Sequence, residues 1–348
     1  MDNGVLEPKR GERVSGHEGD EVAPVWVLDD PGDSYSRQAV GIAERLGVPH
    51  LRVNLAWRWA APVAGLLTGR GSLHGLRPGS AHGWPFTAPQ GPALTVGAGR
   101  RAEAVASWLR ARFGCRVVQC TRPHWGLHAS AFDLLVMPEE ERLPQAANVL
   151  PILGVTHRVS PLVLAQARVA WAGRLAHMPR PLIALLVGSG PLGAPMRPHV
   201  ALALARRVAA MAAAVGGSVM ATTSPGTGPK ATEAIADGLS SGINMLYRWG
   251  EPGPNPYEGL LGLADAIVVT GGATSMISEA CSGEAPVFIA AQDDGPRQAA
   301  LQDAFYAAGH ARPLRDSLLP WRRRPLDETG RVAAEIRARM SIGPHGVD

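Results

Sequence analysis

The clearest chemical signal in the sequence is the stretch from 268 to 289, VVTGGATSMISEACSGEAPVFI, in which an apolar run stops at a glycine pair. A short helical segment follows, and a second apolar run begins at Val287, so the pattern predicts strand, glycine turn, helix and strand. In a parallel sheet, such a turn lies at the carboxyl edge, where ligands bind. A glycine turn lets the backbone approach a ligand closely, and the start of the helix attracts an anion.

Glu279 lies about one turn into this predicted helix, where its carboxylate can accept hydrogen bonds from vicinal hydroxyls. The residues expected to hold a phosphate are Gly271, Gly272 and Ala273, followed by Thr274 and Ser275 as N-cap hydroxyls. A site that binds both a phosphate and a pair of vicinal hydroxyls indicates a nucleotide ligand. The same pattern also occurs in α/β proteins that bind no nucleotide, so the hypothesis needs support from the rest of the chain.

Similar strand ends recur elsewhere in the second half of the chain. The further residues expected at this ligand site are Gly188, Ser189 and Gly190, the hydroxyl run Thr222, Thr223 and Ser224, and Asn255. None of the glycine turns matches GxGxxG with an acidic residue at the expected offset, and GxxxxGK[ST] is absent from the sequence. A dehydrogenase and a P-loop enzyme are therefore disfavoured, and a nucleotide-sugar enzyme is favoured.

Two successive runs of alternating strands and helices predict an α/β fold, with two Rossmann-like doubly wound parallel-sheet domains facing a cleft. The predicted divisions are a disordered tail over 1–22, an acceptor-side Rossmann-like domain over 23–165, a linker helix over 166–181, a nucleotide-sugar domain over 182–320, and a basic linker with a terminal helix over 321–348. The length of 348 residues agrees with two domains, because one core usually stops growing at a shorter length.

Composition narrows the classes of partner. A net charge of +4 is small and spread along the chain, without dense basic blocks, so no nucleic acid partner is expected. Three cysteines without a CxxC pair predict neither a disulfide framework nor a zinc site. No DxD motif ends a strand of the second half, so we expect no metal.

A cytoplasmic protein is expected, because no segment reaches the roughly 18 uninterrupted apolar residues of a membrane span. The segment 57–92 differs in composition, since Trp57, Trp59 and Trp84 lie among prolines, glycines and arginines. One interpretation is an amphipathic segment that makes a peripheral contact with the inner membrane. The other, which we favour, is an excursion that packs on its own domain.

The stretch from 264 to 289 resembles the donor-site element of GT-B glycosyltransferases, especially the lipid-linked N-acetylglucosaminyltransferase of peptidoglycan synthesis. The resemblance implies that Glu279 binds the ribose and that the turn from Gly272 to Ser275 holds the diphosphate. The sequence DGPRQAA resembles the loop that contacts the hydroxyls of the donor sugar, which implicates Arg297 and Gln298.

A longer resemblance, over about 25 to 315, is to the Elm family, which is named after a plant mitochondrial fission factor and is common in bacteria. It lies in ordered motifs that include WVLDDPGDSYSRQAVGIAERLGVP, FDLLVMPEEE, NVLPILGVTHRVSP and NPYEGLLGLADAIVVT. The chain departs from the family pattern at three places. These are Gly272-Ala273 where Asp-Ser is usual, Pro225-Gly226 where two arginines are usual, and Glu140-Glu141 where His-Asp is usual.

The leading hypothesis is an inverting, metal-independent glycosyltransferase that uses a nucleotide diphosphate sugar and requires no other cofactor. Its acceptor is unidentified, and a lipid-linked or envelope acceptor is one option. A general base must come from the first domain, and the candidates are Asp30, Asp33, His124 and Glu140. Two alternatives stay open: a nucleotide-sugar epimerase, and a non-catalytic scaffold or membrane-associated adaptor that retains the fold.

Overall fold

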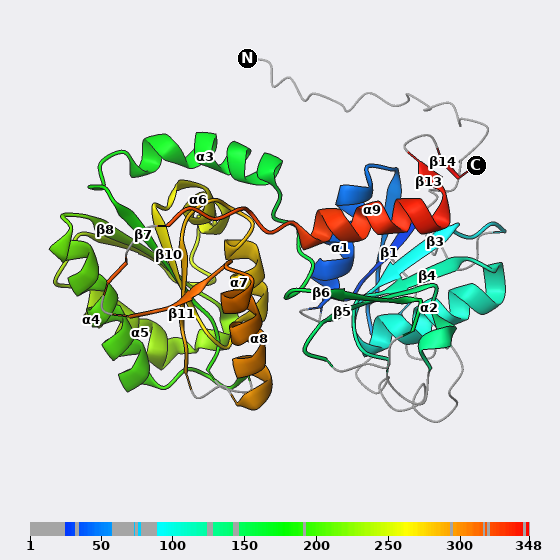
Figure 1. The fold of residues 1–348 in the computed structure, drawn as a ribbon, viewed down its shortest axis with the longest axis horizontal. Coiled ribbons are helices and arrows are strands. Elements are labelled where there is room, and N and C mark those ends of the chain that lie inside the picture. The colour runs from blue at the N-terminus through cyan, green and yellow to red at the C-terminus, as the bar shows by residue number, and fades with distance from the viewer. Residues whose placement is uncertain are drawn as a thin grey trace, which may run out of the picture.

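The chain folds into two α/β domains, each built on a six-stranded sheet (Figure 1). The computed structural model describes residues 25–31, 35–57, 73, 76–77, 89–123, 128–141, 146–190, 193–292, 295–315, 317–318, 321–343 and 346–347. The expected tail over 1–22 and most of the segment 57–92 lie outside these residues, so their disorder and membrane contact stay predictions.

The first sheet has the strand order β2-β1-β3-β4-β5-β6, and all its neighbouring strands are parallel. Its elements are β1 (Val25–Asp29), α1 (Ser36–Leu46), β2 (His50–Asn54), β3 (Leu94–Gly97), α2 (Arg100–Phe113), β4 (Arg116–Gln119), a 3₁₀ turn (Ala129–Ala131), β5 (Leu134–Pro138) and β6 (Val149–Ile152). The strand order reverses between β1 and β3, which makes this the switch point of the first domain.

The second sheet has the order β12-β11-β10-β7-β8-β9 and is also parallel throughout. Its elements are α3 (Pro161–Leu175), β7 (Leu182–Val187), α4 (Pro198–Ala214), β8 (Ser218–Thr223), a 3₁₀ turn (Pro225–Thr227), α5 (Pro229–Leu239), β9 (Asn244–Tyr247), α6 (Tyr257–Leu263), β10 (Ala266–Thr270), α7 (Thr274–Ala280), β11 (Val287–Ala290), α8 (Pro296–Ala307) and β12 (Arg312–Pro313). Its switch point lies between β7 and β10.

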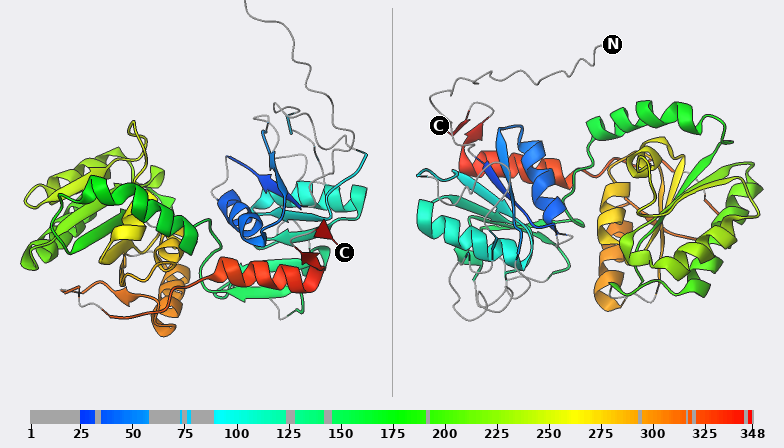
Figure 2. Two further views of the ribbon diagram at one scale, coloured as in Figure 1. Left: turned by 90° about the horizontal axis from the view of Figure 1, so that it is seen from above. Right: turned by 180° about the vertical axis from the view of Figure 1, so that it is seen from behind.

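Helices cover both faces of each sheet, which explains the apolar character of the central strands. The second sheet lies between α4 and α5 on one face and α3, α6, α7 and α8 on the other (Figures 1 and 2). Every residue of β7 and β10 is buried, as expected for parallel strands covered on both sides. The prediction of two doubly wound Rossmann-like domains, the fold implied by the GT-B resemblance, is confirmed.

The chain crosses between the domains twice. After β6 it runs through residues 153–160 into α3, where Ser160 caps the helix by accepting a hydrogen bond from Val163 N at 3.2 Å. After the second sheet it returns through residues 321–327 to α9 (Glu328–Met340), which packs beside α1 of the first domain (Figure 1). The short strands β13 (Ile342–Gly343) and β14 (Gly346–Val347) follow. No helix within the described ranges is long and apolar enough to span a bilayer.

Candidate functional site

Three turns meet at the carboxyl edge of the second sheet, next to its switch point. They follow β7, β8 and β10. The predicted residues lie in these turns or directly beside them, with Thr222 and Thr223 at the end of β8 and with Thr274 and Ser275 at the start of α7. The backbone N of Gly188 donates to Thr270 Oγ1 at 2.8 Å, and a Cβ placed on Gly188 would lie 2.4 Å from the Cβ of Ala273. The turns after β7 and β10 are therefore in direct contact, which requires glycine at position 188.

The hydroxyl-rich turn after β8 is held by bonds within the protein. Thr223 Oγ1 accepts a hydrogen bond from Trp249 N at 3.0 Å, and Ser224 Oγ lies 3.3 Å from Thr227 Oγ1. Thr227 Oγ1 also donates to the carbonyl oxygen of Val187 at 2.8 Å and thereby ties this turn to the end of β7. Thr222 is buried, with its Oγ1 3.5 Å from the carbonyl oxygen of Thr223.

The start of α7 differs from the sequence expectation. The prediction that Thr274 and Ser275 cap the helix is wrong, because α7 begins at Thr274 with Ala273 at the N-cap position and no side-chain cap. Thr274 Oγ1 instead lies 3.3 Å from the amide atoms of Gln298. Gln298 Nε2 donates to the carbonyl oxygen of Gly271 at 2.5 Å. The predicted sugar loop is thus joined to the glycine turn through Gln298.

Glu279 is half-buried near the other end of α7, and its Oε2 accepts a hydrogen bond from the hydroxyl of Tyr257. Burial raises the pKa of Glu279 to about 7, against the opposing effects of the Tyr257 hydrogen bond and the positive charge of Arg37. Burial and the charge of Glu279 raise the pKa of Tyr257 well above its usual value, so the phenol stays a donor. Because Arg37 belongs to α1, the first domain contributes charge to this carboxylate.

Asn255, another predicted site residue, is exposed, and its side chain contacts the backbone of Tyr257, the partner of Glu279. Its Oδ1 accepts a hydrogen bond from Tyr257 N at 3.0 Å at the point where α6 begins. This contact fixes the start of α6 and with it the position of the Tyr257 side chain. The structure therefore shows a positioning contact for Asn255.

The helix that carries Glu279 is anchored to the crossing between the domains. Ser278 Oγ accepts a hydrogen bond from Val155 N at 3.0 Å, and Ser282 Oγ lies 3.1 Å from His157 Nε2. Thr329 Oγ1, at the start of α9, bonds to both the backbone N and the carbonyl oxygen of His157. Both crossings therefore meet at the end of α7, which places Glu279 at the domain boundary.

The candidate bases of the first domain have different environments. Asp30 follows β1, is buried, and forms a two-pronged ion pair with Arg101, whose Nε lies 2.6 Å from Asp30 Oδ2. Glu140 follows β5 and is half-buried. Asp33 and His124 lie outside the described residues.

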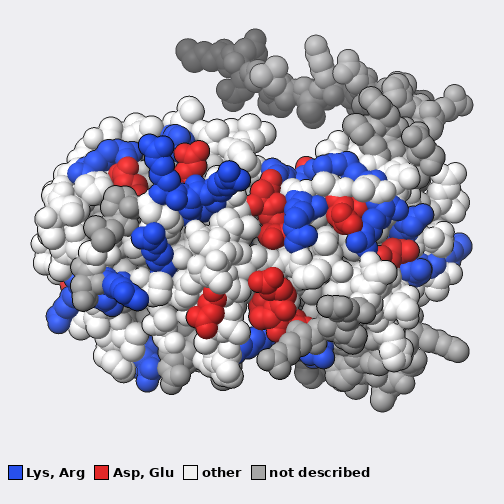
Figure 3. Space-filling view, in the orientation of Figure 1, with Lys and Arg blue, Asp and Glu red and all other residues white. Residues whose placement is uncertain are grey.

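Arg297, predicted at the sugar loop, forms an ion pair with Glu141 of the first domain. Arg297 is in the first turn of α8, and Glu141 follows β5, so this contact joins the carboxyl edges of the two sheets. Acidic side chains gather along the boundary between the two lobes in Figure 3. The structure thus brings the start of α8, where the sugar loop is predicted, against the β5 turn of the first domain.

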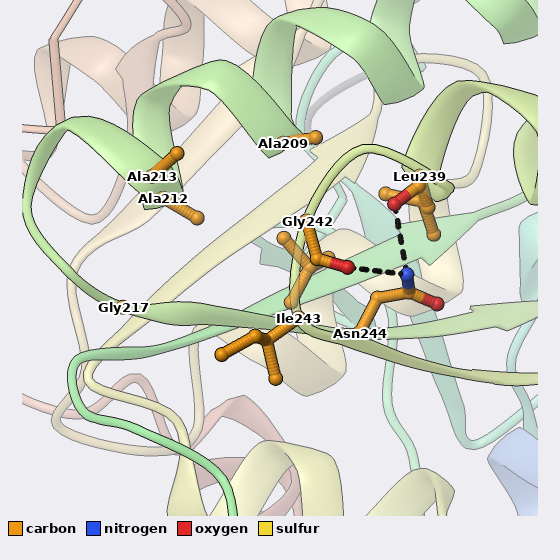
Figure 4. A pocket seen from close by; sticks show the side chains of 9 residues that line it. Ala209, Ala212, Ala213, Gly217, Leu239, Gly242, Ile243 and Asn244 are labelled. Atoms are coloured by element: carbon orange, nitrogen blue, oxygen red, sulfur yellow. Dashed lines mark hydrogen bonds between the residues drawn. The ribbon is translucent and has the colours of Figure 1, made fainter.

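The described part of the chain offers no metal cluster at another place. Among those residues, no group of three or more His, Cys, Asp or Glu side chains is placed to hold a metal ion. A small pocket of about 20 Å³ lies at the amino ends of β8 and β9, opposite the glycine turns (Figure 4). Alanine, glycine and other uncharged residues line it, and its volume suffices for about one water molecule.

Comparison with known proteins shows the family. A sequence model described as Mitochondrial fission ELM1 matches residues 34–340. The chain belongs to the mitochondrial fission ELM1 family. The mitochondrial fission protein ELM1 of Arabidopsis thaliana is 28% identical over 283 residues, which cover 72% of this chain. The chain spans only 64% of the length of that plant relative.

Solved structures similar to this ELM1-family protein share little sequence with it. MurG of Acinetobacter baumannii is 14% identical with a TM-score of 0.45, over 93% of this chain and 96% of MurG. A UDP-GlcNAc 2-epimerase of Methanocaldococcus jannaschii is 12% identical with a TM-score of 0.48, over 90% of this chain and 92% of the epimerase. At these values neither structure bears on the function of the chain.

Several site residues of this ELM1-family protein were not predicted from the sequence. Tyr257 and Arg37 lie within the quoted family motifs, so a signal for them was present. Thr270 lies directly before the glycine pair and could have been included with it. Ser278 and His157 also lie within quoted stretches, but their contacts depend on which crossing segment packs against α7, and the local sequence does not show this.

Proposed function

We propose that the protein binds a nucleotide diphosphate sugar at the domain boundary and transfers the sugar, with inversion and without a metal, to an acceptor held by the first domain. The ribose hydroxyls bind to Glu279, and the diphosphate lies against the turns after β7 and β10. Arg297 and Gln298 contact the sugar. The acceptor is unidentified, with a lipid-linked or envelope acceptor as one option.

The observation that carries this proposal is the environment of Glu279. A carboxylate that is half-buried at a domain boundary, beside a switch point and held by a tyrosine hydroxyl, is arranged to accept hydrogen bonds from a ligand. Its raised pKa marks the cost of burying its charge, which a diol offsets by donating hydrogen bonds to the carboxylate. The α7 helix has only seven residues, so its dipole is a minor part of the proposal.

The contact of Gly188 with Ala273 supports the diphosphate assignment. Because Gly188 has no side chain, the turns after β7 and β10 pack directly against each other, so that one diphosphate can contact both turns. Gln298 also donates a hydrogen bond to the carbonyl oxygen of Gly271 in the turn after β10. The diphosphate surface is therefore built from two turns whose separation is set by direct packing.

A thermal-shift panel tests the proposal. Uridine, guanosine, adenosine and thymidine diphosphates are added, each with and without a common sugar, to the full chain. A ligand at about 100 times its Kd stabilises the folded state by about 2.7 kcal/mol, which raises the unfolding midpoint of a chain of 348 residues by about 4 °C. We expect this shift for one nucleotide base.

The matched control separates the site from general effects of charge. Glu279→Ala should abolish the shift without lowering the unfolding midpoint of the free protein, because it removes a buried carboxylate with a raised pKa. Glu284→Ala, at an exposed residue soon after α7, should keep the shift. No shift from any nucleotide would refute the proposal, and an unchanged shift in Glu279→Ala would refute the ribose assignment. Product analysis with and without a lipid acceptor then distinguishes transfer from epimerisation.

A further inference from the structure

The β5 turn of the first domain faces the sugar loop of the second domain. The ion pair between Glu141 and Arg297 is a direct contact between the two, and it joins residues 156 positions apart. The Glu141 side chain is only 14% exposed, whereas Arg297 is 68% exposed, so the pair lies at the rim with Glu141 on the inner side. Any sugar held by Arg297 and Gln298 would therefore lie next to the β5 turn.

Within this turn, the surroundings of Glu140 differ from those of its two acidic neighbours. Glu139 is exposed, and Glu141 is neutralised by Arg297. The Oε2 atom of Glu140 is buried and has no hydrogen-bond partner within the part of the chain that the structure describes. A buried carboxylate oxygen without a partner is costly, so its presence at a domain boundary indicates a ligand group that binds there.

The other described candidate base is already engaged. Asp30 is held by two guanidinium nitrogens of Arg101, at 2.6 and 2.9 Å, and is buried with that partner. A carboxylate neutralised in this way is a weak proton acceptor, because protonating it would break the ion pair. Among the described residues, Glu140 forms no ion pair of this kind, since Arg297 is bonded to Glu141.

We propose that Glu140 is the catalytic base of the sugar transfer, which rests on the function proposed above. Its carboxylate removes the proton of the acceptor hydroxyl while that oxygen forms a bond to the anomeric carbon of the sugar. The bond from the anomeric carbon to the diphosphate oxygen breaks, and its electron pair leaves with the nucleoside diphosphate. The proton stays on Glu140 until solvent removes it.

The Glu141–Arg297 pair acts as a positioning contact in this mechanism. It holds the Arg297 guanidinium on Glu141 and beside the proposed position of the sugar. Burial raises the pKa of Glu140, whereas a hydrogen bond with its own backbone and the positive charge of Arg297 lower it, and the negative charge of Glu139 raises it slightly further. A carboxylate with a raised pKa is a better base near neutral pH, since the ideal catalytic pKa lies close to the working pH.

The test uses Glu140→Gln, with Glu139→Gln as a matched control at the exposed neighbour. The probe is the nucleotide diphosphate sugar that stabilises the wild-type chain most in the thermal-shift panel, and release of nucleoside diphosphate is the measured rate. We expect Glu140→Gln to keep the thermal shift and to lower the rate about 100-fold or more. Glu139→Gln should keep at least half of the rate, and Glu140→Asp should restore part of it.

The pH profile separates a base from a structural role. The wild-type rate should fall as the pH drops through the pKa of Glu140, and this fall should disappear in Glu140→Gln. A rate in Glu140→Gln within twofold of wild type would overturn the assignment while leaving nucleotide binding intact. Absence of any release by the wild-type chain, although the donor binds, would also overturn it. Failure of every nucleotide to bind would overturn the proposed function together with this assignment.

Discussion

His157 provides a test of how firmly the domain crossing is joined to α7. The imidazole is only 4% exposed, and its Nε2 lies 3.1 Å from Ser282 Oγ. Burial lowers the pKa of His157 to about 4, with the charge of Asp327 acting in the opposite direction. The folded chain therefore keeps this imidazole neutral at pH values where the unfolded chain binds a proton.

The magnitude follows from proton linkage. An unfolded histidine has a pKa of about 6.5, so between pH 6.5 and pH 4 the unfolded state binds more protons than the folded state. The free energy of unfolding then rises with pH and is lost as the pH falls through this window. Between pH 7 and pH 5 the expected loss from His157 alone is about 2 kcal/mol.

The assay is urea unfolding of the wild-type chain and His157→Gln at pH 7 and pH 5, followed by far-ultraviolet circular dichroism. The glutamine amide can still contact Ser282 but takes up no proton, so the variant should lose about 2 kcal/mol less than wild type on acidification. His177→Gln, at an exposed histidine just after α3, should keep the wild-type pH dependence. An equal loss in wild type and His157→Gln would refute the inference that the crossing buries a neutral imidazole.

Three further predictions concern the proposed nucleotide site and the packing around α7. Nucleotide affinity should weaken about tenfold from pH 8 to pH 6, because the carboxylate form of Glu279, with a pKa of about 7, binds the ribose. An affinity that titration calorimetry finds equal at both pH values would contradict this. In urea unfolding, Gly188→Ala should destabilise the fold by about 1–3 kcal/mol, because the added methyl group forces the turns after β7 and β10 apart. The control Gly242→Ala should leave the stability unchanged, because open space surrounds that position. Arg323→Met should lower the free energy of unfolding by about 1–3 kcal/mol, because the Arg323 guanidinium donates to three carbonyl oxygens at the end of α7 and just beyond it. Arg322→Met, at an exposed position, is the control, and equal unfolding midpoints for the two variants would contradict the prediction.

The two sheets could be predicted because short stretches of sequence are enough to identify their strands. The apolar runs of β7 and β10, each followed by a glycine or hydroxyl turn, indicate central strands of a parallel sheet. The same pattern places Glu279 in the helix that directly follows the glycine turn after β10. The Val332, Ile336 and Met340 face of the last helix was also visible in the sequence.

What could not be predicted depends on contacts between distant segments. The apolar face of α9 does not reveal that its partner is α1, nearly 300 residues earlier. The N-cap assignment failed because Gln298, from another helix, bonds to Thr274. The burial that raises the pKa of Glu279 likewise arises from the packing of α6 and the first domain around it.

A crystal structure of the full chain with the best-binding nucleotide diphosphate tests the central claim most directly. We expect the ribose hydroxyls within hydrogen-bond distance of the Glu279 carboxylate, and the diphosphate against the turns at 188–190 and 271–275. A nucleotide bound away from Glu279, or none bound at saturating concentration, would contradict the claim.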